Sequence, residues 1–175
     1  IRVTDLTEAP ADFNARFRAT AKCYVYSLDL GREPDPLSAR YAWHVPFPID
    51  LERLRALLPL LEGTHDFAGF QSVGNPAKRT VRTLFSARLD PGGLIQSRDA
   101  AVLWRIEFRG DGFLYHMVRN ITGTVIEIAR GRFAPEFLEE SLQSPGPFRG
   151  HCAPAHGLAL ASVEYAAFAA NESAP

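Results

Sequence analysis

The sequence predicts one α+β domain over residues 1–175, with a largely antiparallel sheet and helices packed on one face. Segments in which apolar and polar residues alternate are interspersed with segments of helical periodicity. Pro91-Gly92-Gly93 begins a turn between two predicted strands, which indicates a hairpin in the middle of the chain. A chain of 175 residues with 46% hydrophobic and 22% charged side chains is long enough for one core. Together these features favour the α+β class.

The first predicted strand is Phe13–Tyr26, and Gly31–Pro36 ends it. Its odd-numbered residues are small or apolar, whereas its even-numbered residues include the cations and two tyrosines: Arg16, Arg18, Lys22, Tyr24 and Tyr26. Alternation with a period of two places these sets on opposite faces. Cations along a sheet face follow phosphates and an aromatic ring stacks a base, so the even face is interpreted as an RNA platform. The alternative is a strand with this face in solvent.

A helix is predicted next, with Asp50 as its N-cap and Gly63 at its C-cap. Its leucines recur at helical spacing, and Pro59 is expected to kink or shorten it. Two strands follow, Thr80–Leu89 and Ala101–Phe108. The first is expected to place on one face Val81, Thr83, Phe85, Ala87 and Leu89. The cations of Lys78–Arg88 indicate equally well a phosphate-binding rim or a solvated strand.

The third part of the chain is predicted to begin with a long helix, from Phe113 to about Arg130, closed by Gly131. One side has an apolar stripe, and beside it lie His116, Arg119, Asn120, Gly123, Glu127 and Arg130. Glycine within this polar face indicates close approach of backbone or of a ligand, and the alternative is a solvated face. A short helix with Pro135 in its first turn, an irregular segment Pro145–Gly157 and a last strand Leu158–Tyr165 complete the prediction.

Composition and motifs exclude several classes of function. No run approaches the ~20 apolar residues of a membrane span, and the first residues do not resemble a signal peptide, so a cytoplasmic protein is expected. Two cysteines predict free thiols. A net charge of −1 argues mildly against a nucleic-acid partner. Two segments are nevertheless basic and contain no acidic residue. The first basic segment lies between Asp12 and Asp29, and the second lies between Asp66 and Asp90. His151-Cys152 with His156 matches no familiar zinc spacing, and no nucleophile elbow or phosphate-binding glycine loop is present, so no metal or cofactor is expected.

Four segments, in chain order, resemble the tRNA pseudouridine synthase A family. The most characteristic runs from Phe113 to Gly123 (Phe-Leu-Tyr-His-Met-Val-Arg-Asn-Ile-Thr-Gly). The others are the tyrosine strand Phe13–Tyr26, the middle segment Gly63–Phe70 followed by Arg79-Thr80, and the closing loop Ala153–Leu158. Four ordered matches that cover nearly the whole chain are far more specific than any one of them.

The resemblance implies an isomerase that converts uridine to pseudouridine without a cofactor, at positions 38–40 of the tRNA anticodon arm, in a homodimer. It implies that Tyr24 is the active-site tyrosine that contacts the target base. Arg119 would pair with a catalytic aspartate, and Leu158 would form an apolar wall of the uracil pocket. His116 is expected to bind substrate, together with the cations of the tyrosine strand, Arg16, Arg18 and Lys22.

One family motif is absent. The nucleophilic aspartate of the family lies in Arg-Thr-Asp-Ala-Gly-Val-His-Ala, and none of the aspartates of this chain has that context. In the family this motif lies upstream of the tyrosine strand, and Met117 is the only methionine here. We therefore expect the chain to be the C-terminal half of such a fold and to be inactive alone. The alternative hypothesis is a non-catalytic RNA-binding module derived from that fold.

Overall fold

Strand β1 (Ala19–Asp29) organises the sheet because it pairs with three other strands. It is antiparallel to β5 (Leu103–Gly110) on one side and to β6 (Leu158–Tyr165) on the other, and its end pairs in parallel with the short β2 (Trp43–His44). Beyond β5 come β4 (Val81–Pro91) and β3 (Gly63–Asp66), both antiparallel. The structure is a computed structural model that describes residues 2–4, 6–72, 74, 79–93, 102–143 and 146–166.

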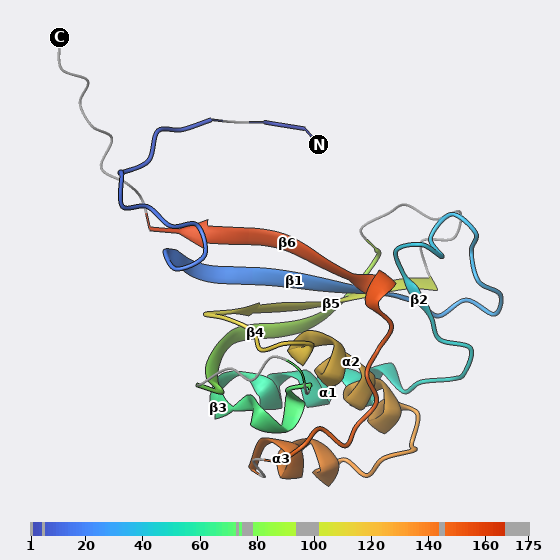
Figure 1. Ribbon diagram of the computed structural model, residues 1–175. Helices are drawn as coiled ribbons and strands as arrows, with labels where there is room; N and C mark the ends of the chain where they lie inside the picture. The colour runs from blue at the N-terminus through green and yellow to red at the C-terminus, as the bar shows by residue number, and fades with distance from the viewer. Residues whose placement is uncertain are drawn as a thin grey trace.

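The three α-helices lie on the same face of this sheet (Figure 1), so the predicted fold class is confirmed. They are α1 (Leu51–Leu57), α2 (Met117–Ala129) and α3 (Glu136–Gln143). Asp50 caps α1 as predicted, because its Oδ1 accepts a hydrogen bond from the Arg53 N–H at 3.0 Å. Pro59 shortens α1 as predicted, since the chain continues as the 3₁₀ helix η1 (Leu58–Leu61). Within the described residues, no helix has the length and apolar character needed to cross a membrane.

Several predictions of where elements begin are wrong. β1 begins at Ala19 and not at Phe13, because residues 11–17 form turns in which the Asn14 side chain accepts from the N–H groups of Arg16 and Phe17. β3 was not predicted; Gly63 begins it with a positive φ of 98°. The long helix begins only at Met117, since His116 adopts a left-handed conformation with φ of 61°.

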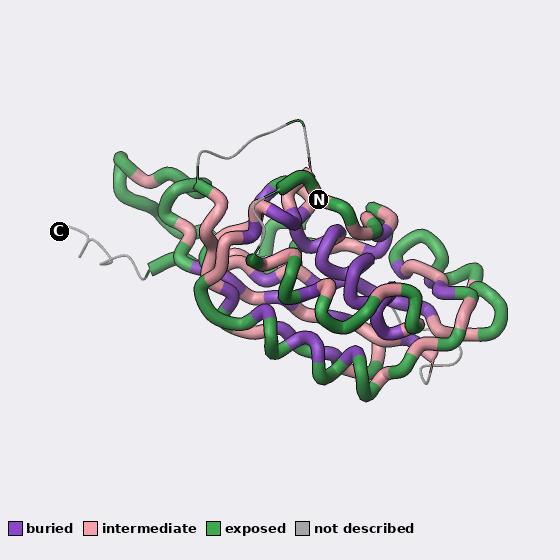
Figure 2. The backbone as a smooth tube through the Cα atoms, turned by 90° about the horizontal axis from the view of Figure 1, so that it is seen from below, coloured by how far each residue is buried: buried purple, intermediate pink, exposed green. Residues whose placement is uncertain are grey.

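The core lies between the sheet and the helices. Every residue of α2 except Arg119 is buried, so the hypothesis that its polar side is solvated is wrong (Figure 2). On β1, Tyr26 and Leu28 face the helices and are completely buried. The even-numbered face of β1 is therefore the covered face over its second half, so the alternative in which this face lies in solvent is wrong there. We call this helix-covered face of the sheet the inner face, and the opposite one the outer face.

A β-bulge in β4 changes the face of one predicted side chain. Leu84 pairs with Gly110 and Ser86 with Arg109, so one extra residue lies between the two pairs. As a result Leu84 is 1% exposed and Phe85 is 44% exposed. The prediction that Phe85 shares a face with Ala87 is wrong: its ring lies under the guanidinium of Arg109, with 5.1 Å between Cζ and the ring centroid.

Candidate functional site

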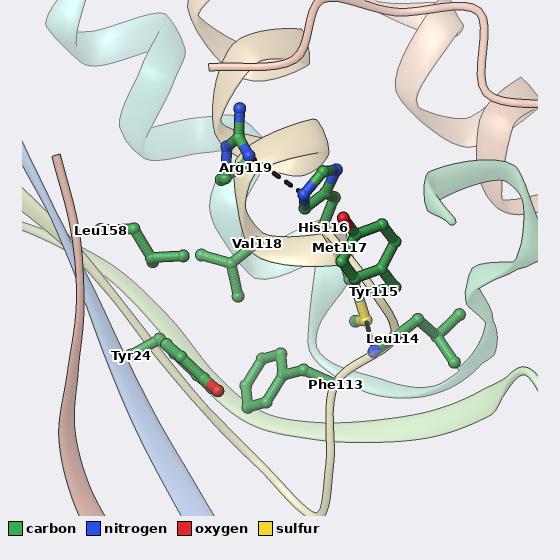
Figure 3. A pocket seen from close by; sticks show the side chains of 9 residues that line it. All are labelled: Tyr24, Phe113, Leu114, Tyr115, His116, Met117, Val118, Arg119 and Leu158. Atoms are coloured by element: carbon green, nitrogen blue, oxygen red, sulfur yellow. Dashed lines mark hydrogen bonds between the residues drawn. The ribbon is translucent and has the colours of Figure 1, made fainter. Parts of the chain in front are cut away.

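A cavity of about 300 Å³ opens on the inner face, where the turn before α2 meets β1 and the start of β6. We call it the Tyr24 cavity. Three segments far apart in the sequence line it, as Figure 3 shows: Tyr24 from β1, Leu158 from β6, and Phe113, Leu114, Tyr115, His116, Met117, Val118 and Arg119. Most of these side chains are apolar or aromatic and few are polar, which is typical of a pocket for a small planar group.

The turn that precedes α2 shapes one wall of the Tyr24 cavity. The Met117 N–H donates to the carbonyl of Leu114 at 3.1 Å, and His116 has the positive φ already described. Phe113 therefore lies outside the helix, where its ring packs edge-on against Tyr24 with 5.0 Å between centroids. The expected helix over Phe113 would have placed this ring in the apolar stripe, and the unusual backbone of His116 is the feature that sequence periodicity does not reveal.

Arg119 is held in place by neutral acceptors. Its Nε donates to the carbonyl of Ala153 at 2.7 Å, and its Nη1 donates to Nε2 of His116 at 3.1 Å. The Ala153 N–H in turn donates to the carbonyl of Arg119 at 3.1 Å. Within the described part of the chain Arg119 has no carboxylate partner. Its orientation is therefore fixed while its charge stays available to an anionic group.

The protonation of His116 follows from its two partners. Because a guanidinium can only donate, Nε2 of His116 must be the acceptor, and the proton belongs on Nδ1, 3.2 Å from Oγ of Ser72. The Asn120 side-chain amide donates to the same Oγ at 3.1 Å and to the carbonyl of Phe70 at 2.8 Å. Burial lowers the pKa of His116, and the charge of Arg119 lowers it further. A neutral imidazole thus links Arg119 to a network that includes Ser72, a residue that the sequence did not indicate.

The closing loop crosses directly over α2 at Gly123. A Cβ placed on Gly123 would lie 1.9 Å from the carbonyl oxygen of His151. The prediction of a close backbone approach at this glycine is therefore confirmed. The same crossing brings Ala153 to Arg119. Among the described residues, no cluster of His, Cys, Asp and Glu is arranged to hold a metal ion.

A second anchor places Leu158 at the Tyr24 cavity. The hydroxyl of Tyr26 donates to the carbonyl of Pro154 at 2.6 Å. Gly157 lies on the same ring, since a Cβ there would be 2.7 Å from two of its carbons. Burial raises the pKa of Tyr26, so its hydroxyl stays protonated as a donor. The buried second tyrosine of β1 thus holds the loop, and the half-buried Tyr24 remains in the cavity lining.

A neighbouring cavity of about 400 Å³ is strongly basic. We call it the basic cavity; it is lined by Arg16, Phe17, Lys22, Arg79, Val81, Arg82, Asp111, Gly112 and Phe113. The structure thus gathers Tyr24, His116, Arg119 and Leu158 around one cavity and Arg16 and Lys22 around the next. Arg18 lines neither cavity; it forms an exposed ion pair with Asp12. Of the second basic segment, Arg79 and Arg82 line the basic cavity, and Lys78 lies outside the described residues.

Comparisons with known proteins identify the family to which the chain is similar. Residues 58–166 match the family model described as tRNA pseudouridine synthase. The chain is 38% identical over 172 residues to tRNA pseudouridine synthase A 1 of Desulfotalea psychrophila and 40% identical over 169 residues to tRNA pseudouridine synthase A of Syntrophotalea carbinolica. These alignments cover 94% and 95% of the chain but only 66% and 63% of the relatives. The chain therefore spans somewhat less than two thirds of the length of these relatives.

Proposed function

The chain belongs to the tRNA pseudouridine synthase family, and from this premise we propose that the whole protein isomerises uridine to pseudouridine at positions 38–40 of the tRNA anticodon arm. In this reaction the bond from C1′ to N1 of uracil breaks and a bond from C1′ to C5 forms. C5 loses its proton and N1 gains one, so the product is an isomer and no redox cofactor is consumed. The target base would have to leave the helical stack before it reached a cavity in the protein.

The observation that carries the proposal is the meeting of Tyr24, Leu158 and Arg119 around one cavity of about 300 Å³. In our proposal the ring or hydroxyl of Tyr24 contacts the base, and Leu158 forms an apolar wall against it. Phe113 holds the Tyr24 ring from the side, which limits the freedom of the tyrosine before substrate binds. His116 would act next to the substrate through Arg119, because both of its ring nitrogens already have partners.

The nucleophile is proposed to come from outside these 175 residues. Among the residues that the structure describes, no aspartate or glutamate lines the Tyr24 cavity, and the aspartate motif of the family does not occur in the sequence. An arginine fixed by neutral acceptors would stabilise the ionised form of an incoming aspartate and orient it. We accordingly expect no activity from the chain alone. A homodimer remains a prediction from the family resemblance, and a cytoplasmic location remains a prediction from the sequence.

Release of tritium from tRNA labelled at C5 of uridine tests the proposal, because that hydrogen is lost when C5 bonds to C1′. We expect release with the whole protein, and a loss of about 10²–10³-fold in kcat for Tyr24→Phe and for Arg119→Ala. Tyr41→Phe is the matched control, since Tyr41 is 53% exposed and lines neither cavity. Unchanged turnover in both cavity variants would refute the assigned roles.

Two further outcomes separate the alternatives. tRNA binding by the whole protein without any tritium release would favour the non-catalytic RNA-binding module. The observation in favour of that module is that no carboxylate occurs among the described residues that line the Tyr24 cavity. Tritium release by the 175-residue chain itself would mean that a nucleophile lies within it. That result would contradict the proposed origin of the aspartate.

A further inference from the structure

The basic cavity has an excess of positive charge that the protein does not neutralise. Four cations, Arg16, Lys22, Arg79 and Arg82, line it together with one carboxylate, Asp111, so its formal charge is +3. Oδ1 of Asp111 accepts from the Thr83 N–H at 3.0 Å and is therefore engaged with the backbone. In the described residues none of the four cations forms a salt bridge. Like charges around one cavity repel each other, and an anion there would relieve that repulsion.

Local structure aims two of these cations at the same space. Lys22 pairs with Gly110 and Gly110 with Leu84, so these residues share the inner face, and Arg82 lies two residues before Leu84 on that face. Nη1 of Arg82 donates to the carbonyls of Arg79 at 2.9 Å and Val81 at 2.7 Å. Like Arg119, Arg82 is thus oriented by neutral acceptors that leave its charge in place.

Two glycines allow close packing beside the basic cavity, which Gly112 lines. A Cβ on Gly110 would lie 2.8 Å from both Cδ2 of Leu84 and the carbonyl oxygen of Thr83. A Cβ on Gly112 would lie 3.3 Å from Nε of Arg82. A side chain at Gly110 would displace β4, and a side chain at Gly112 would displace the Arg82 guanidinium. Glycine at these positions therefore lets Arg82 keep the orientation in which it can reach a ligand.

The basic cavity adjoins the Tyr24 cavity. Phe113 lines both, and its ring packs against Tyr24. On the far side, the Phe17 ring is 78% exposed, with the Arg16 guanidinium 5.6 Å from its centroid. An exposed aromatic ring beside cations is a stacking surface for an unpaired base.

We propose that the basic cavity binds one phosphate of the RNA backbone next to the target nucleotide, with Arg79 and Arg82 as its ligands and Phe17 as a stacking surface for the neighbouring base. The inference rests on the proposed function, because it places the phosphate beside the base in the Tyr24 cavity. It resolves the two interpretations of the second basic segment residue by residue. Arg79 and Arg82 belong to a phosphate site, whereas Arg88 lies on the outer face, where it pairs in register with Glu107 of β5, which in turn pairs with Val25 of β1.

The salt dependence of tRNA binding by the whole protein tests the inference. Loss of one phosphate contact should make the slope of log K against log salt shallower by about 0.7–0.9, and affinity at physiological salt should fall roughly tenfold in Arg82→Ala. Arg88→Ala is the matched control, because it removes the same charge from the same strand on the other face. Arg82→Gln keeps a donor for the backbone carbonyls and should give the same change of slope, which guards against misfolding of the alanine variant.

Further arms of the experiment locate the ligand. Because Arg79 and Arg82 share one phosphate in this proposal, the double alanine variant should lose no more slope than Arg82→Ala alone; a loss twice as large would overturn the single shared phosphate. A slope that is unchanged in Arg82→Ala, with normal tritium release, would overturn the inference and leave the proposed function intact. Absence of release from the wild type, with the slope change present, would instead count against the proposed reaction.

The basic cavity could instead bind a free phosphate ion, which presents the same charged oxygens as an RNA phosphate. Calorimetric titration with inorganic phosphate distinguishes these two ligands. Binding of inorganic phosphate that Arg82→Ala abolishes, together with an unchanged tRNA slope, would assign the basic cavity to a free anion and overturn the proposal. We expect instead weak phosphate binding, a changed tRNA slope, and a higher KM with kcat retained at saturating tRNA, since the phosphate contact positions the strand and does not touch the reacting atoms.

Discussion

Arg109 on the outer face of the sheet and the arginines around the two cavities have opposite kinds of partner. On the outer face, Nε and Nη2 of Arg109 donate to the two carboxylate oxygens of Glu164 at 2.7 and 2.6 Å, and this lowers the pKa of Glu164. On the inner face, Arg119 and Arg82 donate to backbone carbonyls and to a neutral imidazole. A carboxylate fixes an arginine and cancels its charge, whereas a neutral acceptor fixes the arginine and leaves the charge for a ligand.

The surroundings of β1 follow the same division. On its outer side Cys23 is only 8% exposed, and burial raises the pKa of its thiol, as do the charges of Glu107 and Glu164. The raised pKa keeps this thiol in its unreactive protonated form. On the inner side Tyr24 remains half-buried in a cavity. In the proposed function, the inner face receives the negatively charged RNA and the outer face contributes to stability.

The largest expected effect comes from the contact that shapes the inner face. Alanine has a helix propensity about 1 kcal/mol better than glycine, but in Gly123→Ala the new Cβ would lie 1.9 Å from a backbone oxygen of His151. We expect a net loss of about 3 kcal/mol in the free energy of unfolding, because α2 or the closing loop must move. Denaturant unfolding measures this loss. Displacement of the loop should also remove the Ala153 contact of Arg119 and lower kcat.

Gly146→Ala is the control for this substitution. A Cβ at Gly146 would have no neighbour within 4 Å, and its φ is not positive, so the change should stay within about 0.5 kcal/mol. Equal stability of the two variants would mean that the loop does not press on α2. The inner face would then lack the rigid support that distinguishes it here.

Sequence patterns predicted the parts of this fold that depend on local periodicity. β6 has the predicted bounds, and Asp50 and Pro59 act on α1 as expected. The errors lie where a side-chain hydrogen bond or one extra residue interrupts the alternation of apolar and polar residues. Asn14 replaces the first turns of a strand with side-chain hydrogen bonds, and the bulge before Ser86 reverses the alternation of β4.

The sequence predicted several residues that line the candidate site but not the hydrogen bonds that hold them in place. Motif resemblance named Tyr24, Arg119 and Leu158, which the structure brings to one cavity. Ser72 and the carbonyl of Ala153 were missed, because a tertiary hydrogen bond to a serine or to a backbone atom leaves no periodic trace in a sequence. The place of Arg82 in a basic cavity could have been predicted from the sequence, because no acidic residue lies between Asp66 and Asp90.

A smaller effect on activity is expected from protonation of His116, the neutral acceptor of Arg119. Because the folded protein lowers the pKa of His116, its neutral form persists through the ordinary histidine range and is lost only as the pH falls through the lowered pKa. Protonation would remove the acceptor and place a second cation beside Arg119, the charged group that faces this ring. The kcat of the whole protein should therefore fall on the acid side of the pH profile.

His116→Gln tests this dependence, since the glutamine oxygen can still accept from Arg119 but does not titrate. We expect kcat to fall about tenfold or less at neutral pH and the histidine component of the acid limb to disappear. His116→Phe removes the acceptor as well and should lose more activity at every pH. An acid limb that is identical in His116→Gln and wild type would show that another group controls it.

The smallest effect is expected on the outer face, where the charges of Arg109 and Glu164 can be exchanged. Arg109→Glu alone would place two carboxylates together and lower Tm slightly, and adding Glu164→Arg should restore it. The side chains are 39% and 42% exposed, so solvent screens the pair and limits its contribution. In the exchanged variant kcat should remain within roughly twofold of the wild type. A larger fall would mean that the carboxylate pairs of the outer face influence the Tyr24 cavity, and the functional division between the two faces would then be wrong.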